Sequence, residues 1–156
     1  MTPQDLMRRA VALSMEKMQG GSGGPFGAVI ARDGVIVAEG WNQVTSSADP
    51  TAHAEVVAIR LACQALGRFD LADCEIFTSC EPCPMCLGAI YWARLRRIWF
   101  GNDRKDAAAI GFDDDFLYRE IPLPLDRRSI PTEQLLPNEA RAAFDAWLEK
   151  SDRVAY

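Results

Sequence analysis

The sequence lacks the features that would place it among membrane, secreted or nucleic-acid-binding proteins. No apolar run approaches the roughly 18 residues that a membrane span needs, and neither repeats nor low-complexity segments occur. Residues 1–9 are polar and charged, so we expect no secretory signal. The formal net charge of -5 leaves no basic excess for binding phosphates. We therefore expect a small-molecule substrate and neither a nucleic-acid nor a membrane partner.

Histidine is scarce: the chain has one histidine, His53, and five cysteines. Three of these cysteines, Cys80, Cys83 and Cys86, are crowded together. That spacing is typical of a metal site rather than a disulfide framework, which predicts a reducing, cytoplasmic location. The length of 156 residues and the 49% hydrophobic content suit one globular domain over residues 1–156.

One imidazole, two thiolates and a nearby carboxylate are the groups that a catalytic zinc site needs, with a fourth position left to water. His53 and two cysteines would be the protein ligands. Glu55, two residues after the histidine, would carry protons rather than bind the ion. The alternatives are three merely buried thiols or a closed structural zinc site, and a structural site would have no use for Glu55.

The choice between the three crowded cysteines is open on spacing alone, since any two could bind the ion. Pro84 suits the first turn of a helix, which would place Cys83 and Cys86 one turn apart on one face. Cys80 falls at the end of a predicted strand. We therefore prefer Cys83 and Cys86.

The pattern of apolar residues predicts an α/β protein. Helices are expected over residues 3–19, 52–66, 84 onward, 106–110 and 137–150. Strands are expected over 26–32, 35–41, 75–79 and 97–101, with an edge strand over 130–136. Thr2 and Thr51 are expected N-caps, and Asp33-Gly34 predicts a hairpin turn. The strands at 75–79 and 97–101 would form a parallel crossover.

Two polar segments have two interpretations each. Asn42 ends a predicted strand, where it is either a substrate contact or a turn residue bonded to its own backbone. The three adjacent aspartates at 113–115 are either a solvated turn or a source of one carboxylate for a purine amidine edge.

Several segments together resemble the cytidine and deoxycytidylate deaminase superfamily. They are GGPFGAV at 23–29, DPTAHAEV at 49–56, TSCEPCPMC at 78–86 and GFDDDF at 111–116. The superfamily signature H-x-E followed by P-C-x-x-C is matched in full. The GFDD segment and the terminal tyrosine are most similar to the branch that acts on guanine.

The resemblance implies a three-layer α/β/α sandwich around a five-stranded mixed sheet. It implies one zinc ion per chain, held by His53, Cys83 and Cys86, with Glu55 as the proton shuttle. The implied reaction is hydrolysis of guanine to xanthine and ammonia.

The resemblance also implies a substrate site and an oligomer. Asn42 would read the base, Phe26 and Trp92 would flank it, and Asp114 would lie near the purine amino group as a second catalytic residue. Ala54 and Tyr156 complete the predicted substrate contacts. A homodimer is implied, in which the tail at 151–156 closes its own or its partner's site, with the C-terminal segment swapped in the second case.

Three rival functions are weighed against this one. A guanosine deaminase would have the same core motifs. A tRNA adenosine deaminase would share the zinc motif, but such proteins usually carry a Gly-Ala-Gly-Ser-like stretch and a basic face, whereas residues 107–116 read AAAIGFDDDF in an acidic chain. A zinc-stabilised binding module would need no Glu55.

Overall fold

A computed structural model describes residues 1–112 and 114–156, so Asp113 of the acidic segment lies outside the described residues. By its internal contacts the chain forms two compact units, residues 1–115 and residues 116–156. A single functional domain over residues 1–156 stays a prediction.

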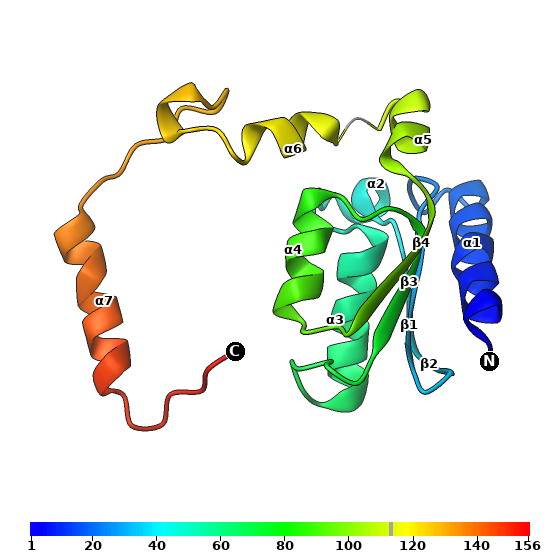
Figure 1. Ribbon diagram of the computed structural model, residues 1–156, viewed down its shortest axis with the longest axis horizontal. Helices are drawn as coiled ribbons and strands as arrows, with labels where there is room; N and C mark the ends of the chain where they lie inside the picture. Colours follow the sequence, from blue (N-terminus) through cyan, green and yellow to red (C-terminus); the bar gives the residue numbers. More distant parts are fainter. Residues whose placement is uncertain (113) are drawn as a thin grey trace. The chain divides into compact units, whose positions relative to one another are not determined.

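The first unit alternates helices and strands (Figure 1). Its elements are α1 (Pro3–Gln19), β1 (Gly27–Arg32), β2 (Val35–Trp41), α2 (Val44–Ser47), α3 (Ala54–Leu66), β3 (Glu75–Cys80), α4 (Pro84–Trp92), β4 (Arg97–Asn102) and α5 (Arg104–Ala109). The strands and long helices predicted for this unit are present, with bounds that agree within two residues, and only the short helix expected at 106–110 starts earlier.

The strands form one mixed sheet in the order β2-β1-β3-β4. β1 pairs antiparallel with β2 and β3, whereas β3 pairs parallel with β4 across α4. The α/β class and the parallel crossover are therefore confirmed. The expected fifth strand is wrong for the part of the chain described: residues 131–136 are in no strand, and Pro131 lacks the N–H that a sheet ladder needs.

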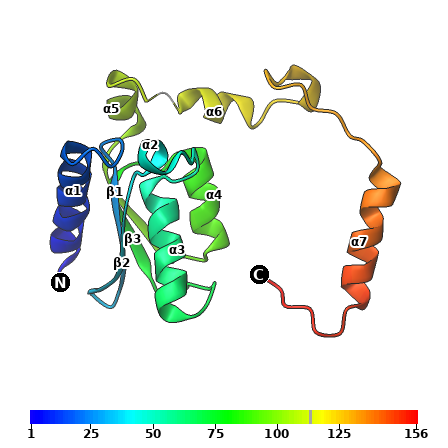
Figure 2. The ribbon, with the colours of Figure 1, turned by 180° about the vertical axis from the view of Figure 1, so that it is seen from behind.

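Helices cover both faces of this sheet (Figures 1 and 2). Alternate residues of β1 point to opposite faces: Val29 packs with α1 around Leu13, and Ile30 packs with α3 and α4 around Ala58 and Ile90. The sheet is thus buried between two apolar layers, which is why β1 reads as an almost continuous apolar run.

Gly40 lets α3 lie unusually close to β2. A Cβ atom at this position would be 2.2 Å from the carbonyl oxygen of Ala54 and 2.6 Å from the amide nitrogen of Ala58. Both contacts are with helix backbone, which cannot turn aside. The close packing of the first turn of α3 on the sheet therefore depends on the missing side chain.

One of the two predicted N-caps is present in the structure, and the other is not. Thr2 and Asp5 form the capping box of α1. Thr51 does not cap α3, because its hydroxyl donates to Asp49 Oδ1 at 2.7 Å and its N–H donates to the same oxygen at 2.8 Å. The aspartate turn ends there, and α3 begins at Ala54 with His53 as N-cap.

The second unit contains α6, η1 (Leu125–Arg127) and α7 (Pro137–Glu149), with α6 (Asp115–Glu120) beginning at the unit boundary. None of the residues 116–156 is buried. Phe144 is 76% exposed and Leu135 is 82% exposed. Nowhere in the described ranges does a helix reach the length and apolar character needed to cross a membrane.

Candidate metal and active site

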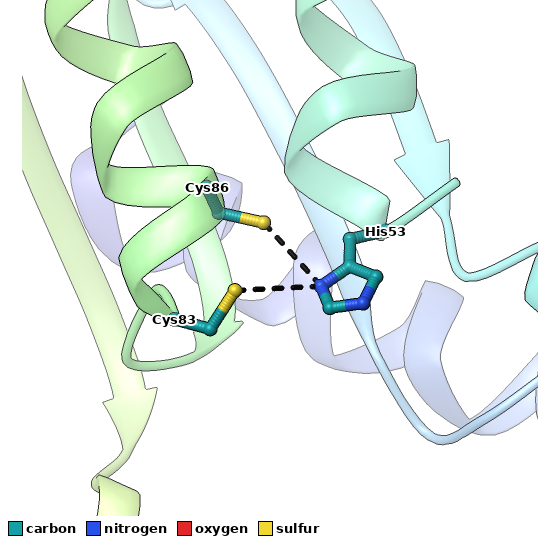
Figure 3. A group of neighbouring side chains, drawn as sticks. All are labelled: His53, Cys83 and Cys86. Atoms are coloured by element: carbon teal, nitrogen blue, oxygen red, sulfur yellow. Dashed lines mark hydrogen bonds between the residues drawn. The ribbon is translucent and has the colours of Figure 1, made fainter. Parts of the chain in front are cut away.

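Two helix N-termini bring the predicted metal ligands together (Figure 3). His53 is the N-cap of α3, and Cys83 is the N-cap of α4 with Pro84 in its first turn. Cys86 lies in the same first turn and is buried. The partial positive charge of a helix N-terminus favours thiolate over thiol, so the fold places both sulfurs where a metal ligand is stabilised.

The spacing of the donor atoms fits a tetrahedral zinc ion. His53 Nδ1 lies 3.6 Å from Cys83 Sγ and 3.5 Å from Cys86 Sγ. Zinc bonds of about 2.3 Å to sulfur and about 2.0–2.1 Å to nitrogen, at a tetrahedral angle, separate the two donors by about 3.6 Å. The one imidazole and two thiol groups form the only such cluster found among the described residues. The residues present therefore fit a zinc ion with one position left open.

The two ligand thiols have opposite proton affinities. The neighbouring Cys86 thiol, through a hydrogen bond to the Cys83 sulfur, lowers the pKa of Cys83 to about 4, with a further contribution from His53. The same hydrogen bond and burial raise the pKa of Cys86. Cys83 thus holds a thiolate, and a metal ion must displace the proton of Cys86 when it binds.

Glu55 lies beside the ligands without joining them. It is 6% exposed, and Cys86 Sγ donates to its Oε2 at 3.4 Å. Burial raises the pKa of Glu55, so this carboxyl group takes up a proton more readily than an ordinary glutamate. A buried carboxyl group of raised pKa next to a metal site suits a group that accepts and returns protons.

Cys80 is not part of the ligand cluster. Its thiol ends β3 and is 3.9 Å from the carbonyl oxygen of Asp103, and burial raises the pKa of Cys80 to about 11. The donor atoms of His53, Cys83 and Cys86 lie within 4.8 Å of one another, and Cys80 is outside that group.

Asn42 and Phe26 lie side by side at the ends of the first two strands. The backbone N–H of Asn42 donates to the Phe26 carbonyl at 3.1 Å. The Asn42 Oδ1 atom accepts from the N–H groups of Gly24 and Val44, both at 3.2 Å. Asn42 is buried, and Ala54 is buried in the first turn of α3 next to His53.

The Asp114 carboxyl group is close enough to the predicted ligand His53 for its charge to act on that imidazole. Its negative charge contributes to the raised pKa of His53, and burial raises its own pKa. Its Oδ1 atom is buried and has no hydrogen-bond partner among the residues that the structure describes. An unpaired buried acceptor is costly, and a donor on a bound molecule would remove that cost.

Two of the predicted substrate contacts are not tested by the structure. Trp92 is the last residue of α4, about 12 Å along the helix axis from its first turn. Tyr156 belongs to the second unit and is exposed. Their contacts with a base stay predictions.

Two residues near the site were not found by sequence reasoning. Thr78 is buried with its hydroxyl 3.5 Å from Glu55 Oε1, and it donates to the Cys80 carbonyl at 2.8 Å. Phe112 packs edge-on against Phe26 with ring centroids 4.9 Å apart. Thr78 stands inside the TSCEPCPMC segment, which is the only sequence signal for it. Phe112 is found only through a contact between distant segments.

The chain matches known proteins along its whole length. Residues 1–102 match the family model of the cytidine and deoxycytidylate deaminase zinc-binding region. The chain is 52% identical to guanine deaminase from Bacillus subtilis over 156 residues, which is all of both chains. The X-ray structure of guanine deaminase from Bacillus subtilis superposes with a TM-score of 0.97, covering 100% of this chain and 99% of the other.

A more partial similarity is found to a protein that is named for another activity. A tRNA-specific adenosine deaminase from Agrobacterium fabrum is 41% identical over 86 residues, which is 55% of this chain and 57% of that protein. With its His-Cys-Cys cluster and its buried glutamate, this chain belongs to the cytidine and deoxycytidylate deaminase family.

Proposed function

We propose that this protein hydrolyses guanine to xanthine and ammonia, with zinc held by His53, Cys83 and Cys86. The observation that carries the proposal is the 52% identity to a guanine deaminase over all 156 residues. The similarity to a tRNA-specific adenosine deaminase covers 55% of this chain, so that activity is the weaker candidate.

The chain's own residues would manage the protons of the reaction. Zinc, when bound, lowers the pKa of water from about 15.7 to about 7, which makes hydroxide available at neutral pH. Glu55 would take the proton released from water, since its buried carboxyl has a raised pKa. After attack at C2 of the purine, Glu55 would return this proton to the ring nitrogen, then take the proton of the new C2 hydroxyl and pass it to the amine, which leaves as ammonia when the C2–N bond breaks. One water is consumed and one ammonia is released.

The base would be oriented by the residues around the metal. Asn42 would hydrogen-bond the base, and Phe26 would pack on its face. Asp114 would accept a hydrogen bond from the purine amino group through Oδ1, a buried acceptor that has no partner within the described part of the chain. A carboxylate that accepts a hydrogen bond there would help to orient the leaving nitrogen and would assist the proton transfer to it.

A substrate panel tests this proposal. Purified zinc-loaded protein is assayed for ammonia release from guanine, guanosine, adenine, cytosine and a tRNA anticodon stem-loop. We expect ammonia from guanine alone. Turnover of guanosine instead would assign the site to nucleosides, and turnover of the stem-loop would assign it to tRNA. Bound zinc without hydrolysis of any of them would support a binding module.

We further propose that the protein is a homodimer whose C-terminal segment covers a site in the partner subunit. The support is the absence of buried residues over 116–156 together with the exposed Phe144 and Leu135. Such apolar side chains on a segment without a core of its own are typical of a surface that another chain covers. We take that chain to be a second copy, with Tyr156 as a lid residue.

Subunit mixing distinguishes a swapped tail from one that closes its own site. Glu55→Gln is co-expressed with a chain that lacks residues 151–156. If the tail closes the partner's site, half of the dimers are mixed and each has one complete site, so roughly a quarter of wild-type activity returns. If the tail closes its own site, the mixture stays as inactive as its two components. Sedimentation equilibrium of the wild type gives the oligomeric state itself.

A cytoplasmic location is also proposed. All five cysteines are free thiols, the state that a reducing compartment maintains. Fractionation of the native host with a redox-state thiol label would test this.

A further inference from the structure

The glycine-rich loop between α1 and β1 lies directly against Asn42. The N–H of Gly24 donates to Asn42 Oδ1 at 3.2 Å. The N–H of Val44, two residues after Asn42, donates to the same oxygen, also at 3.2 Å. Both donors are backbone groups. The amide oxygen of Asn42 therefore has both of its acceptor positions in use.

These two donors determine which end of the Asn42 amide is free. An amide nitrogen cannot accept a hydrogen bond, so two N–H groups aimed at one end require the oxygen there. The Nδ2 amino group is left over. Among the described residues it has no hydrogen-bond partner, and it is not one of the fully buried polar atoms that lack a partner. Since Asn42 is 7% exposed, its side chain is held in this orientation by its surroundings.

Gly23 completes the arrangement by leaving space for the amide. A Cβ atom at Gly23 would lie 2.2 Å from the Asn42 carbonyl oxygen and 2.6 Å from its Oδ1. Neither atom can easily move aside, because Oδ1 is held by two backbone donors and the carbonyl belongs to the residue that directly follows β2. Any side chain at this position would push Asn42 out of its hydrogen bonds.

The loop is itself tied to the segment after Asn42. Ser46 in α2 donates through its hydroxyl to the carbonyl oxygen of Ser22 at 2.6 Å. The loop and α2 therefore hold the asparagine from both sides, and its orientation does not depend on a bound base.

We propose that Gly23 and Gly24 are positioning residues that present Asn42 to the base as a hydrogen-bond donor. A purine with an acceptor at that place, such as the 6-oxo group of guanine, is then favoured over one with a 6-amino group. This inference rests on the proposed function, in which Asn42 reads the base. It adds that Asn42 donates a hydrogen bond to the base, rather than accepting one, because the glycine loop fixes the orientation of its amide.

A mutant cycle tests whether Gly23 acts through Asn42. Gly23→Ala, Asn42→Ala and the double variant are loaded with zinc, and KM and kcat for guanine are measured together with zinc content. We expect KM to rise about tenfold in each single variant, the loss of one hydrogen bond, with zinc content unchanged. The double variant should have the KM of Asn42→Ala alone, because the two changes remove the same contact.

A matched control comes from the same loop. Gly21 has a φ of 76° and no atom within 4 Å of where its Cβ would be, and asparagine tolerates this conformation. Gly21→Asn should keep the wild-type KM. A KM as high as that of Gly23→Ala would show that any change in the loop weakens binding, and it would overturn the assignment to Gly23.

A second variant tests the donor itself and does not depend on Gly23→Ala folding. Asn42→Asp keeps an oxygen for both backbone N–H groups but replaces the donor by an acceptor. We expect this variant to bind guanine about tenfold more weakly. 2,6-Diaminopurine carries a 6-amino group, so its affinity, measured by competitive inhibition, should rise relative to the affinity for guanine. An unchanged ratio of the two affinities would overturn the inference.

The outcomes separate this inference from the proposed function. If wild-type protein releases no ammonia from guanine, the proposed function fails. If it does but Asn42→Ala keeps the wild-type KM, the base-reading role of Asn42 fails, and the inference falls with it. If Asn42→Ala raises KM while Gly23→Ala leaves it unchanged, or if the two effects add in full, the positioning role alone is wrong.

Discussion

Adding one methyl group at Gly40 should damage both the fold and the metal site. The added Cβ would lie 2.2 Å from the Ala54 carbonyl oxygen, whereas an ordinary contact of this kind is about 3.4 Å. The first turn of α3 must therefore move by about 1 Å from the sheet. Inserting a methyl group into a packed interface typically costs about 1–3 kcal/mol, and each kcal/mol lowers the Tm of a chain of this size by about 2–4 °C.

The same movement should weaken zinc binding, because His53 is the N-cap of α3. Its Nδ1 atom now lies 3.5 and 3.6 Å from the two sulfurs of α4, and a shift of α3 alone changes those distances. Disturbing the surroundings of a ligand typically lowers metal affinity by about 10–100-fold. Thermal unfolding followed by circular dichroism and zinc competition with a chelating dye measure the two effects in Gly40→Ala.

Gly88→Ala is the control for Gly40→Ala. Gly88 lies within α4, and no atom is within 4 Å of where its Cβ would be. Alanine there should stabilise the helix by about 1 kcal/mol. A Gly40→Ala protein with wild-type Tm and zinc affinity would refute the argument that close packing of α3 on β2 holds the site together.

Three further changes have defined outcomes. Glu55→Gln should retain one zinc per chain by atomic absorption and lose about 10²–10⁴-fold in kcat; near-normal turnover with zinc bound would contradict the proton-shuttle role. Cys80→Ser should keep full zinc content, since Cys80 is outside the ligand cluster, and loss of the metal would place it among the ligands. Glu39→Gln removes a carboxylate that accepts from Arg9 at 2.7 and 2.9 Å. The Arg9 hydrogen bond lowers the pKa of Glu39 below 4.5, so the stability it contributes is present above about pH 4.5 and lost as pH falls through the folded pKa. The pair, whose side chains are about one third exposed, contributes about 0.5–1 kcal/mol, so chemical denaturation should show a larger difference between variant and wild type at pH 7 than at pH 3; an equal difference at both pH values would contradict the linkage.

Local signals explain why so much of the first unit could be predicted. The Thr2–Asp5 capping box and the Asp33-Gly34 turn are complete within a few residues. The candidate metal site is also built from local pairs, His53 with Glu55 and Cys83 with Cys86. Each pair is brought to a helix N-terminus by its own segment, so the sequence alone identifies it.

What could not be predicted depends on contacts between distant segments. The orientation of the Asn42 amide is set by Gly24, eighteen positions earlier, and no periodicity records it. Thr51 has the side chain of an N-cap, yet its hydroxyl binds Asp49 instead.

The strand expected at 130–136 failed for a related reason. Ile130 and Leu135 have the apolar character of strand residues, but a strand also needs a partner to pair with, and a propensity pattern does not supply one. In the described chain both residues are exposed. In our proposal, a second copy of the chain covers the apolar side chains after Asp115.

The central claim is that guanine is hydrolysed at a zinc ion held by His53, Cys83 and Cys86. Its most direct test is a zinc titration of chelator-stripped protein, with xanthine formation from guanine measured at each point. The account predicts no xanthine without metal and a linear rise that ends at one zinc ion per chain. Xanthine formation by the metal-free protein, or none from the fully loaded protein, would contradict it.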